Sequence, residues 1–162
     1  MNKKKKESAR EGLDETDLQL LKQIQQDGRI SNASLSEKIN LSETPCWRRW
    51  KRLEEDGYIE DYRTVLNRRM MGYSVIAFTQ VSFSSHDVDL TNEFEAIVSE
   101  LEWVQMCHCI TGNVDYILQM VFKDLDDFSE RINVIRRIPG VNAIQSHLSV
   151  KEIKTSNKLP IG

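Results

Sequence analysis

Apolar residues recur at helical spacing through the first third of the chain. Cys46, Trp50 and Leu53 stand at i, i+4 and i+7, so they form one apolar stripe along a helix. Ser42 supplies an N-cap just before this stripe, and Pro45 falls in the first turn, where its missing N–H does no harm. With two similar patterns upstream, the sequence predicts helices at about 14–26, 32–39 and 43–55.

The pattern changes from helical spacing to alternation after Gly57. Residues 58–65 (YIEDYRTV) alternate with aromatic and β-branched residues, which predicts an extended strand. Two short helices joined by a tight turn and followed by such a strand make a winged helix-turn-helix unit. In a helix-turn-helix, the second helix lies in the DNA major groove.

Beyond the predicted wing, strand and helix patterns follow in the order β-α-β-β-α-β. Alternation along 103–111 places Val104, Met106, His108 and Ile110 on one face of a strand. In such a unit, both helices cover one face of a four-stranded antiparallel sheet. The predicted strands are at about 74–84, 103–111, 114–122 and 141–153, and the helices at about 89–101 and 125–138. The predicted fold class is therefore α+β, with an N-terminal winged helix-turn-helix and a C-terminal ferredoxin-like βαββαβ domain.

This arrangement leaves the second face of the sheet uncovered. The predicted strands carry large residues on that face, and an exposed apolar sheet face promotes aggregation. We therefore expect a partner chain packed sheet-to-sheet or edge-to-edge, with a homodimer as the minimum unit. A two-fold dimer would also present two recognition helices to a pseudo-palindromic DNA site.

Charge is distributed unevenly along the 162 residues. The net charge is −3, but residues 1–70 contain 15 Lys and Arg against 13 Asp and Glu, whereas residues 71–162 contain 7 against 12. Positive charge also lies on the third predicted helix, where no acid occurs between Thr44 and Leu53. This pattern indicates a polyanion partner such as DNA, although a basic helix face can also be simply a solvated surface.

The same patterns divide the chain into five segments and bear on its location. Residues 3–6 are four lysines, but no apolar segment follows them as in a signal peptide. No apolar run approaches the length of a membrane-spanning helix, so we expect a cytoplasmic protein with no membrane association. The predicted segments are 1–12, a flexible basic arm; 13–60, the helix-turn-helix DNA-binding domain; 61–73, a hinge strand and linker; 74–154, the βαββαβ assembly and effector-binding domain; and 155–162, a C-terminal tail.

The chain lacks the residue patterns of common catalytic and metal sites. A metal site usually contains paired C-x-x-C motifs, and the three cysteines Cys46, Cys107 and Cys109 do not form them. The three histidines lie far apart, no Ser-His-Asp set is evident, and no glycine-rich phosphate loop occurs. We therefore expect no catalytic residues, no metal, no cofactor and no enzyme activity.

Four motifs give the sequence a family resemblance. They are LDETD at 13–17, DGRISN at 27–32, LSETPCWRRWKRLEEDGYI at 41–59 and CHCITGNVDYIL at 107–118. Together, and in this order, they resemble the Lrp/AsnC (leucine-responsive, or feast/famine) transcriptional regulators from Leu13 to about Ile161. The TPC sequence and the preceding LS are most similar to the leucine-responsive branch. The resemblance implies a DNA-binding domain, a hinge strand, and a domain that senses amino acids and assembles homodimers into an octamer or a similar ring.

The resemblance also implies a DNA-contacting surface. Arg48 and Arg49 could reach base edges or phosphates, and Arg52, one turn later, is better placed for phosphate. Trp47 departs from the smaller aliphatic residue expected there, and it could either stack on a sugar or pack locally. The DNA-binding residues implied are Ser42, Thr44, Pro45, Trp47, Arg48, Arg49 and Arg52.

The effector pocket implied by the resemblance lies where dimers meet. Gly112 would let backbone N–H groups approach a carboxylate, and Asp115 could pair with an ammonium group, which are the two ends of a free amino acid. The alternative is that Gly112-Asn113 makes a simple hairpin and Asp115 is a solvated strand residue. His147 departs from the expected phenol and could add pH sensitivity. The implied residues are Thr111, Gly112, Asn113, Asp115, His147, Leu148 and Ser149.

The sequence thus predicts a sequence-specific, DNA-binding transcriptional regulator that responds to an amino acid. Its expected partners are double-stranded DNA, a small-molecule amino acid effector and further copies of itself. Two alternatives remain open at this point. One is an architectural DNA-compacting protein, and the other is an amino-acid-binding βαββαβ module without a DNA role.

Overall fold

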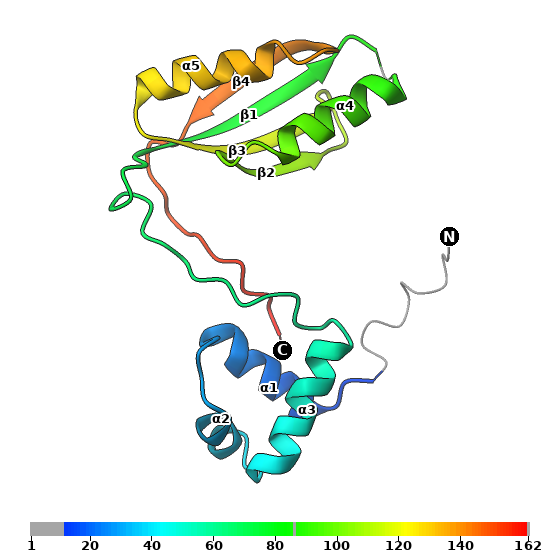
Figure 1. Ribbon diagram of the computed structural model, residues 1–162, viewed down its shortest axis with the longest axis vertical. Coiled ribbons are helices and arrows are strands. Elements are labelled where there is room, and N and C mark those ends of the chain that lie inside the picture. The colour runs from blue at the N-terminus through cyan, green and yellow to red at the C-terminus, as the bar shows by residue number, and fades with distance from the viewer. Residues whose placement is uncertain (1–11, 86, 162) are drawn as a thin grey trace. The chain divides into compact units, whose positions relative to one another are not determined.

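The computed structural model describes residues 12–85 and 87–161, which fall into two compact units (Figure 1). One unit contains the chain up to Val65 together with the residues from Thr155 onward. The other unit contains Leu66–Lys154. The predicted flexible arm at 1–12 lies outside the described residues, apart from Gly12.

Three helices form the N-terminal unit: α1 (Glu15–Gln26), α2 (Asn32–Lys38) and α3 (Glu43–Glu55). The Asp14 side chain caps α1 and forms a reciprocal capping box with Asp17. These bounds agree with the predicted helices to within one residue. The helices enclose a core of Leu20, Ile24, Ile30, Leu35, Ile39, Cys46, Trp50 and Leu53.

The prediction of a strand at 58–65 is wrong. No strand precedes Val75 among the described residues, and 58–66 form no ladder. The alternation correctly indicates extended backbone, but a strand also requires a neighbouring strand. Side-chain contacts to α3 hold this segment instead, chiefly through Tyr62.

The C-terminal unit confirms the βαββαβ prediction. Its four strands form one antiparallel sheet in the order β2-β3-β1-β4. The elements are β1 (Val75–Phe83), α4 (Val88–Ser99), β2 (Val104–Cys109), β3 (Tyr116–Phe122), α5 (Leu125–Arg136) and β4 (Val141–Leu148). Helices α4 and α5 cover the same face of the sheet (Figure 1), where a core rich in Phe, Ile and Val is buried.

Two details of the sheet differ from prediction. The register of β2 shifts between Val104 and Met106, so Val104 packs in the core, whereas Met106 is exposed. The predicted common face of Val104, Met106, His108 and Ile110 is therefore wrong for Val104, because the bulge reverses the facing of residues before it relative to those after it. In addition, β4 ends at Leu148 and not near residue 153.

The chain after β4 returns to the N-terminal unit without further helix or strand. Leu159 exchanges two backbone hydrogen bonds with the Gln25 side chain of α1. The Gln25 amide donates to the Leu159 carbonyl at 2.9 Å, and the Leu159 N–H donates to Gln25 Oε1 at 2.7 Å. The predicted C-terminal tail thus has a defined contact within this unit.

Candidate nucleic-acid interface and effector site

The exposed side of α3 lies opposite its buried stripe. Thr44, Arg48, Lys51 and Glu55 stand at i, i+4, i+7 and i+11, which places them along this side. Arg48 is exposed and makes no hydrogen bond or ion pair with any described residue. Its guanidinium is therefore available to an external anion. Lys51 lies on the same side, although it was absent from the implied DNA-binding set.

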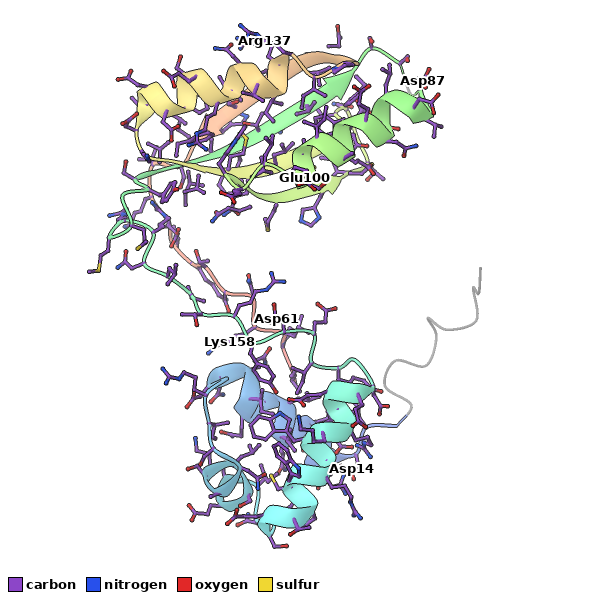
Figure 2. All side chains as sticks on the ribbon, in the orientation of Figure 1. Asp14, Asp61, Asp87, Glu100, Arg137 and Lys158 are labelled. Carbon is purple, nitrogen blue, oxygen red and sulfur yellow. The ribbon has the colours of Figure 1, made fainter. Side chains whose placement is uncertain are left out.

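Arg49 and Arg52 are engaged within the protein. Arg49 Nη1 lies 2.7 Å from Asp14 Oδ2 and 2.8 Å from Asp17 Oδ1, and Arg52 forms an ion pair with the other oxygen of Asp17. Asp17 is fully buried, and the hydrogen bonds that Arg49 donates to Asp17 and Asp14 raise the pKa of Arg49. Figure 2 labels Asp14 at the start of α1. These two arginines thus fasten α3 to α1.

This ion-pair cluster had a signal in the sequence. Asp17 stands three and seven residues before Leu20 and Ile24, so an acid occupies the apolar stripe of α1. An acid that is buried requires a partner, because an unpaired buried carboxylate is costly. The pairing of Asp17 with Arg49 and Arg52 was not predicted from the sequence.

The structure places Trp47 beside Trp50 and leaves half of it exposed. Its ring meets the Trp50 ring edge-on, with centroids 6.2 Å apart, and Lys51 Nζ lies 4.8 Å from its centroid. Trp47 is 49% exposed, whereas Trp50 belongs to the core. Local packing of Trp47 is therefore observed, and the remaining surface is still open to a partner.

The start of α3 contains the other implied DNA-binding residues. Ser42 and Thr44 are exposed, and Pro45 is half-buried. Ser42 occupies the N-cap position without a side-chain capping hydrogen bond. Asn32 of α2 instead donates to the Glu43 carbonyl at 3.1 Å, which joins the two helices of the helix-turn-helix.

The loop after β2 positions the first group of implied effector residues. Thr111, Gly112 and Asn113 are exposed, and Gly112 has a φ of 129°, which only glycine adopts readily. The Asp115 carboxylate is half-buried and accepts a hydrogen bond from the Phe83 N–H at 2.8 Å. Asp115 is therefore attached to the end of β1, unlike the solvated residue considered as the alternative.

The second group lies at the far end of β1. His147 pairs with Phe78, Leu148 pairs with Ala77, and the Ser149 N–H donates to the Ile76 carbonyl. About five residues of β1 separate this group from Phe83, which corresponds to roughly 17 Å along a strand. One chain therefore does not bring the two groups of implied effector residues together.

A separate cavity of about 410 Å³ lies between α4 and β2. None of the implied effector residues lines it. The Tyr116 hydroxyl donates to Glu95 at 2.7 Å at this cavity, and burial raises the pKa of the Cys107 thiol to about 11. No group of three or more potential metal ligands occurs among residues 12–85 and 87–161.

Two protein families match consecutive parts of the chain. Residues 13–60 match the family described as winged helix-turn-helix DNA-binding. Residues 76–159, more than half of the chain, match the Lrp/AsnC ligand binding domain. The chain belongs to the Lrp/AsnC family. The predicted resemblance is therefore confirmed, and the protein is a DNA-binding transcriptional regulator with an Lrp/AsnC ligand-binding domain.

Full-length relatives agree with this assignment to the Lrp/AsnC family. The leucine-responsive regulatory protein of Salmonella typhimurium is 36% identical over 150 residues, which cover 92% of each chain. The Escherichia coli K12 protein of the same name is 35% identical with the same coverage.

Solved structures of regulators are also similar. A Neisseria meningitidis transcriptional regulator in complex with L-Met has a TM-score of 0.88 and 36% identity, covering 91% of this chain and 96% of its own. An AsnC family regulator from Agrobacterium tumefaciens has a TM-score of 0.88 and 29% identity, with 91% and 97% covered. No helix in the described part of this Lrp/AsnC chain is both long and apolar enough to cross a membrane.

Proposed function

We propose that this Lrp/AsnC regulator binds specific, pseudo-palindromic sites in double-stranded DNA as a dimer-based oligomer, and that a free amino acid changes its assembly or DNA affinity. The observation that carries the DNA part is the outward side of α3, where Arg48 is exposed and without a partner in the described chain. The proposed compartment is the cytoplasm, where the free cysteines stay reduced. The role is one of binding, without catalysis.

The proposed DNA surface begins at the N-terminus of α3. Ser42 and Thr44 offer hydroxyl groups to phosphate, and Pro45 shapes the first turn. Arg48 reaches base edges, because a guanidinium can donate two parallel hydrogen bonds to guanine. Trp47 contacts the DNA backbone with its exposed half. The ion pairs of Arg49 and Arg52 with Asp17 favour a positioning role, with phosphate contact as a secondary one.

The proposed effector is a free amino acid. The similar Neisseria meningitidis regulator was solved as an L-Met complex, and this supports the ligand class. Gly112 gives backbone N–H groups access to the carboxylate, and Asp115 supplies the opposite charge for the ammonium group. Because the loop group and the β4 group lie apart in one chain, the complete pocket requires residues from two subunits.

Self-assembly has support from exposed apolar residues outside the sheet and helices. Both of the extended segments, the one after α3 and the one after β4, contain large apolar side chains that are well exposed. Exposed apolar surface of this kind is typical of an interface. On the segment after α3 they are Val65, Leu66, Met70 and Met71, and on the segment after β4 they are Val150, Ile153 and Leu159. A homodimer that assembles further, to an octamer or a similar ring, would cover them.

The DNA part is tested with duplexes selected from a randomised 30-base-pair library. Arg48→Ala should weaken binding to the selected duplex and narrow its preference over an unselected duplex, because the loss of a bidentate guanine contact costs about 1–3 kcal/mol of discrimination. Arg137→Ala, an exposed arginine on the other unit, removes the same charge and serves as the control. Equal binding by the wild type and Arg48→Ala would reject the proposed surface.

The effector part is tested by light scattering coupled to size exclusion with each of the twenty amino acids. We expect one or a few amino acids to shift the mass between multiples of a dimer. A mass and a thermal unfolding midpoint that ignore all twenty would reject the amino acid response. The DNA-binding proposal would stand independently of that result.

A further inference from the structure

Lys51 is the second cation on the outward side of α3, and it is held by neighbouring side chains. Its ammonium lies 2.7 Å from Glu54 Oε2 and 4.8 Å from the centroid of the Trp47 ring. The Lys51 side chain is still 45% exposed, so an external anion can reach it. It stands three residues after Arg48, which is the spacing of neighbours on one helix side.

The other oxygen of Glu54 is occupied by the segment that follows α3. The Tyr62 hydroxyl donates to Glu54 Oε1 at 2.8 Å, and the Trp50 indole N–H donates to the Tyr62 hydroxyl oxygen at 2.5 Å. The Tyr62 ring also lies close to Gly28, where an added Cβ would meet Cδ1 of the ring at 3.4 Å. Tyr62 is thus fixed against two parts of the helix-turn-helix.

We propose that Lys51 is a further DNA phosphate contact, that Glu54 restrains it in the free protein, and that Tyr62 fixes Glu54 in the restraining position. This inference rests on the proposed function, namely that the outward side of α3 meets DNA. It adds one contact residue and two positioning residues to that surface.

Electrostatics explains why Glu54 acts as a restraint. A carboxylate 2.7 Å from the ammonium offsets its charge and repels an approaching phosphate. The hydrogen bond from Lys51 lowers the pKa of Glu54, so the carboxylate stays ionised at neutral pH. Lys51 therefore gains full attraction for phosphate only when Glu54 moves away or loses its charge.

Tyr62 makes this restraint sensitive to the linker. Its hydroxyl is the donor on Glu54 that comes from outside α3, and Tyr62 lies within the segment predicted as the linker between the two units. A displacement of this segment removes the hydroxyl and leaves the carboxylate free to rotate away from Lys51. Events in the C-terminal unit thereby acquire a route to the DNA-binding surface.

The test measures DNA affinity over a range of salt concentrations for the full chain, with the selected duplex as probe. Glu54→Gln should tighten binding and steepen the salt slope by roughly 0.9, because Lys51 becomes a phosphate contact. Glu55→Gln is the matched control, since this exposed neighbour lies on the outward side and makes no ion pair with any described residue. It should change both the affinity and the salt slope much less than Glu54→Gln does. Tyr62→Phe should steepen the slope in the same direction as Glu54→Gln, by a smaller amount.

The decisive comparison repeats the variants in a Lys51→Gln background. There, Tyr62→Phe should have no effect, and Glu54→Gln should match Glu55→Gln. If the wild type binds DNA but the salt slopes of Glu54→Gln and Glu55→Gln are equal, the inference is overturned and the proposed function stands. An effect of Tyr62→Phe that persists without Lys51 also overturns it. Failure of the wild type to bind any selected duplex overturns the proposed function as well. Circular dichroism melting checks that each variant is folded.

Discussion

Arg49 Nη1 lies 2.8 Å from Oδ1 of Asp17, a carboxylate with no solvent exposure. This contact joins α3 to α1, and Arg52 completes it by pairing with the second oxygen of the same carboxylate. The recognition helix is therefore fastened through its basic side chains on one flank, which leaves Arg48 and Lys51 on the outward side. Basic residues that look equivalent in sequence thus divide into an internal pair and an external pair.

Asp17→Asn should destabilise the N-terminal unit. The change removes the charge that both arginines share, and hydrogen bonds to charged groups contribute about 2 kcal/mol to stability. Urea unfolding followed by tryptophan fluorescence in a Trp103→Phe background measures the loss, because the remaining Trp47 and Trp50 both belong to this unit. Glu15→Gln, an exposed acid in the same helix turn, is the control and should leave the midpoint nearly unchanged.

Acidification should lower the free energy of unfolding of the N-terminal unit. Two carboxyl groups, those of Asp14 and Glu54, determine the direction of this change. A backbone hydrogen bond from Asp17 lowers the pKa of Asp14, and the hydrogen bond from Lys51 lowers that of Glu54. Groups with a lowered folded-state pKa stabilise the fold above their ordinary pKa values of 3.8 and 4.5, and this contribution is lost as the pH falls through the folded values. The free energy of unfolding should therefore fall on acidification below about pH 4.5.

Asp14→Asn provides the check on this pH dependence. The variant should be less stable at neutral pH and should lose less stability between pH 5 and the acid limit. Urea unfolding at a series of pH values gives both quantities. A decline in stability as steep as that of the wild type would show that Asp14 has no part in it.

The two cysteines of β2 should differ in reactivity. Burial raises the pKa of the Cys107 thiol to about 11, whereas Cys109 is exposed. At pH 8, a thiol with that pKa is thiolate in only about one molecule in a thousand, and the thiolate is the reactive form. Iodoacetamide labelling followed by peptide mass spectrometry should therefore find Cys109 modified well before Cys107. Equal labelling rates in the folded protein would contradict the burial of Cys107.

Much of the architecture could be predicted from the sequence because it depends on periodicity. The stripe of Cys46, Trp50 and Leu53 predicts α3 with its observed bounds, and the patterns beyond Tyr73 predict the βαββαβ order. Periodicity does not show whether an extended segment finds a partner strand, so the strand at 58–65 was predicted wrongly. It also does not reveal a bulge such as that between Val104 and Met106, which depends on pairing with β3.

The functional surface was harder to predict because it depends on contacts between distant residues. Sequence spacing identified the basic side of α3 but did not distinguish Arg49, which pairs with Asp17 at a separation of 32 residues, from the unpaired Arg48. The role of Tyr62 depends on a contact with Glu54 across the end of α3, which no spacing rule indicates. These roles follow from side-chain geometry and not from residue type.

The separation of the two effector groups leads to a test by mixing. Asp115 is tied to Phe83 at one end of β1, whereas His147 pairs with Phe78 nearer the other. If the pocket contains Asp115 from one subunit and His147 from another, then Asp115→Ala and His147→Ala should each abolish the amino-acid response. Mixed oligomers of the two variants should recover about a quarter of the sites, since random assembly unites both intact residues at that frequency.

The measurement is calorimetric titration of the amino acid identified by light scattering, after the two variants are unfolded together and refolded. The separately refolded variants, combined without subunit exchange, are the control and should bind no amino acid. Recovery in the mixture alone would mean that each pocket is shared between subunits, so effector binding and assembly are coupled by construction. No recovery, with normal oligomer mass, would mean that each chain supplies its own pocket, and residues on β4 would then have to be removed from the proposed site.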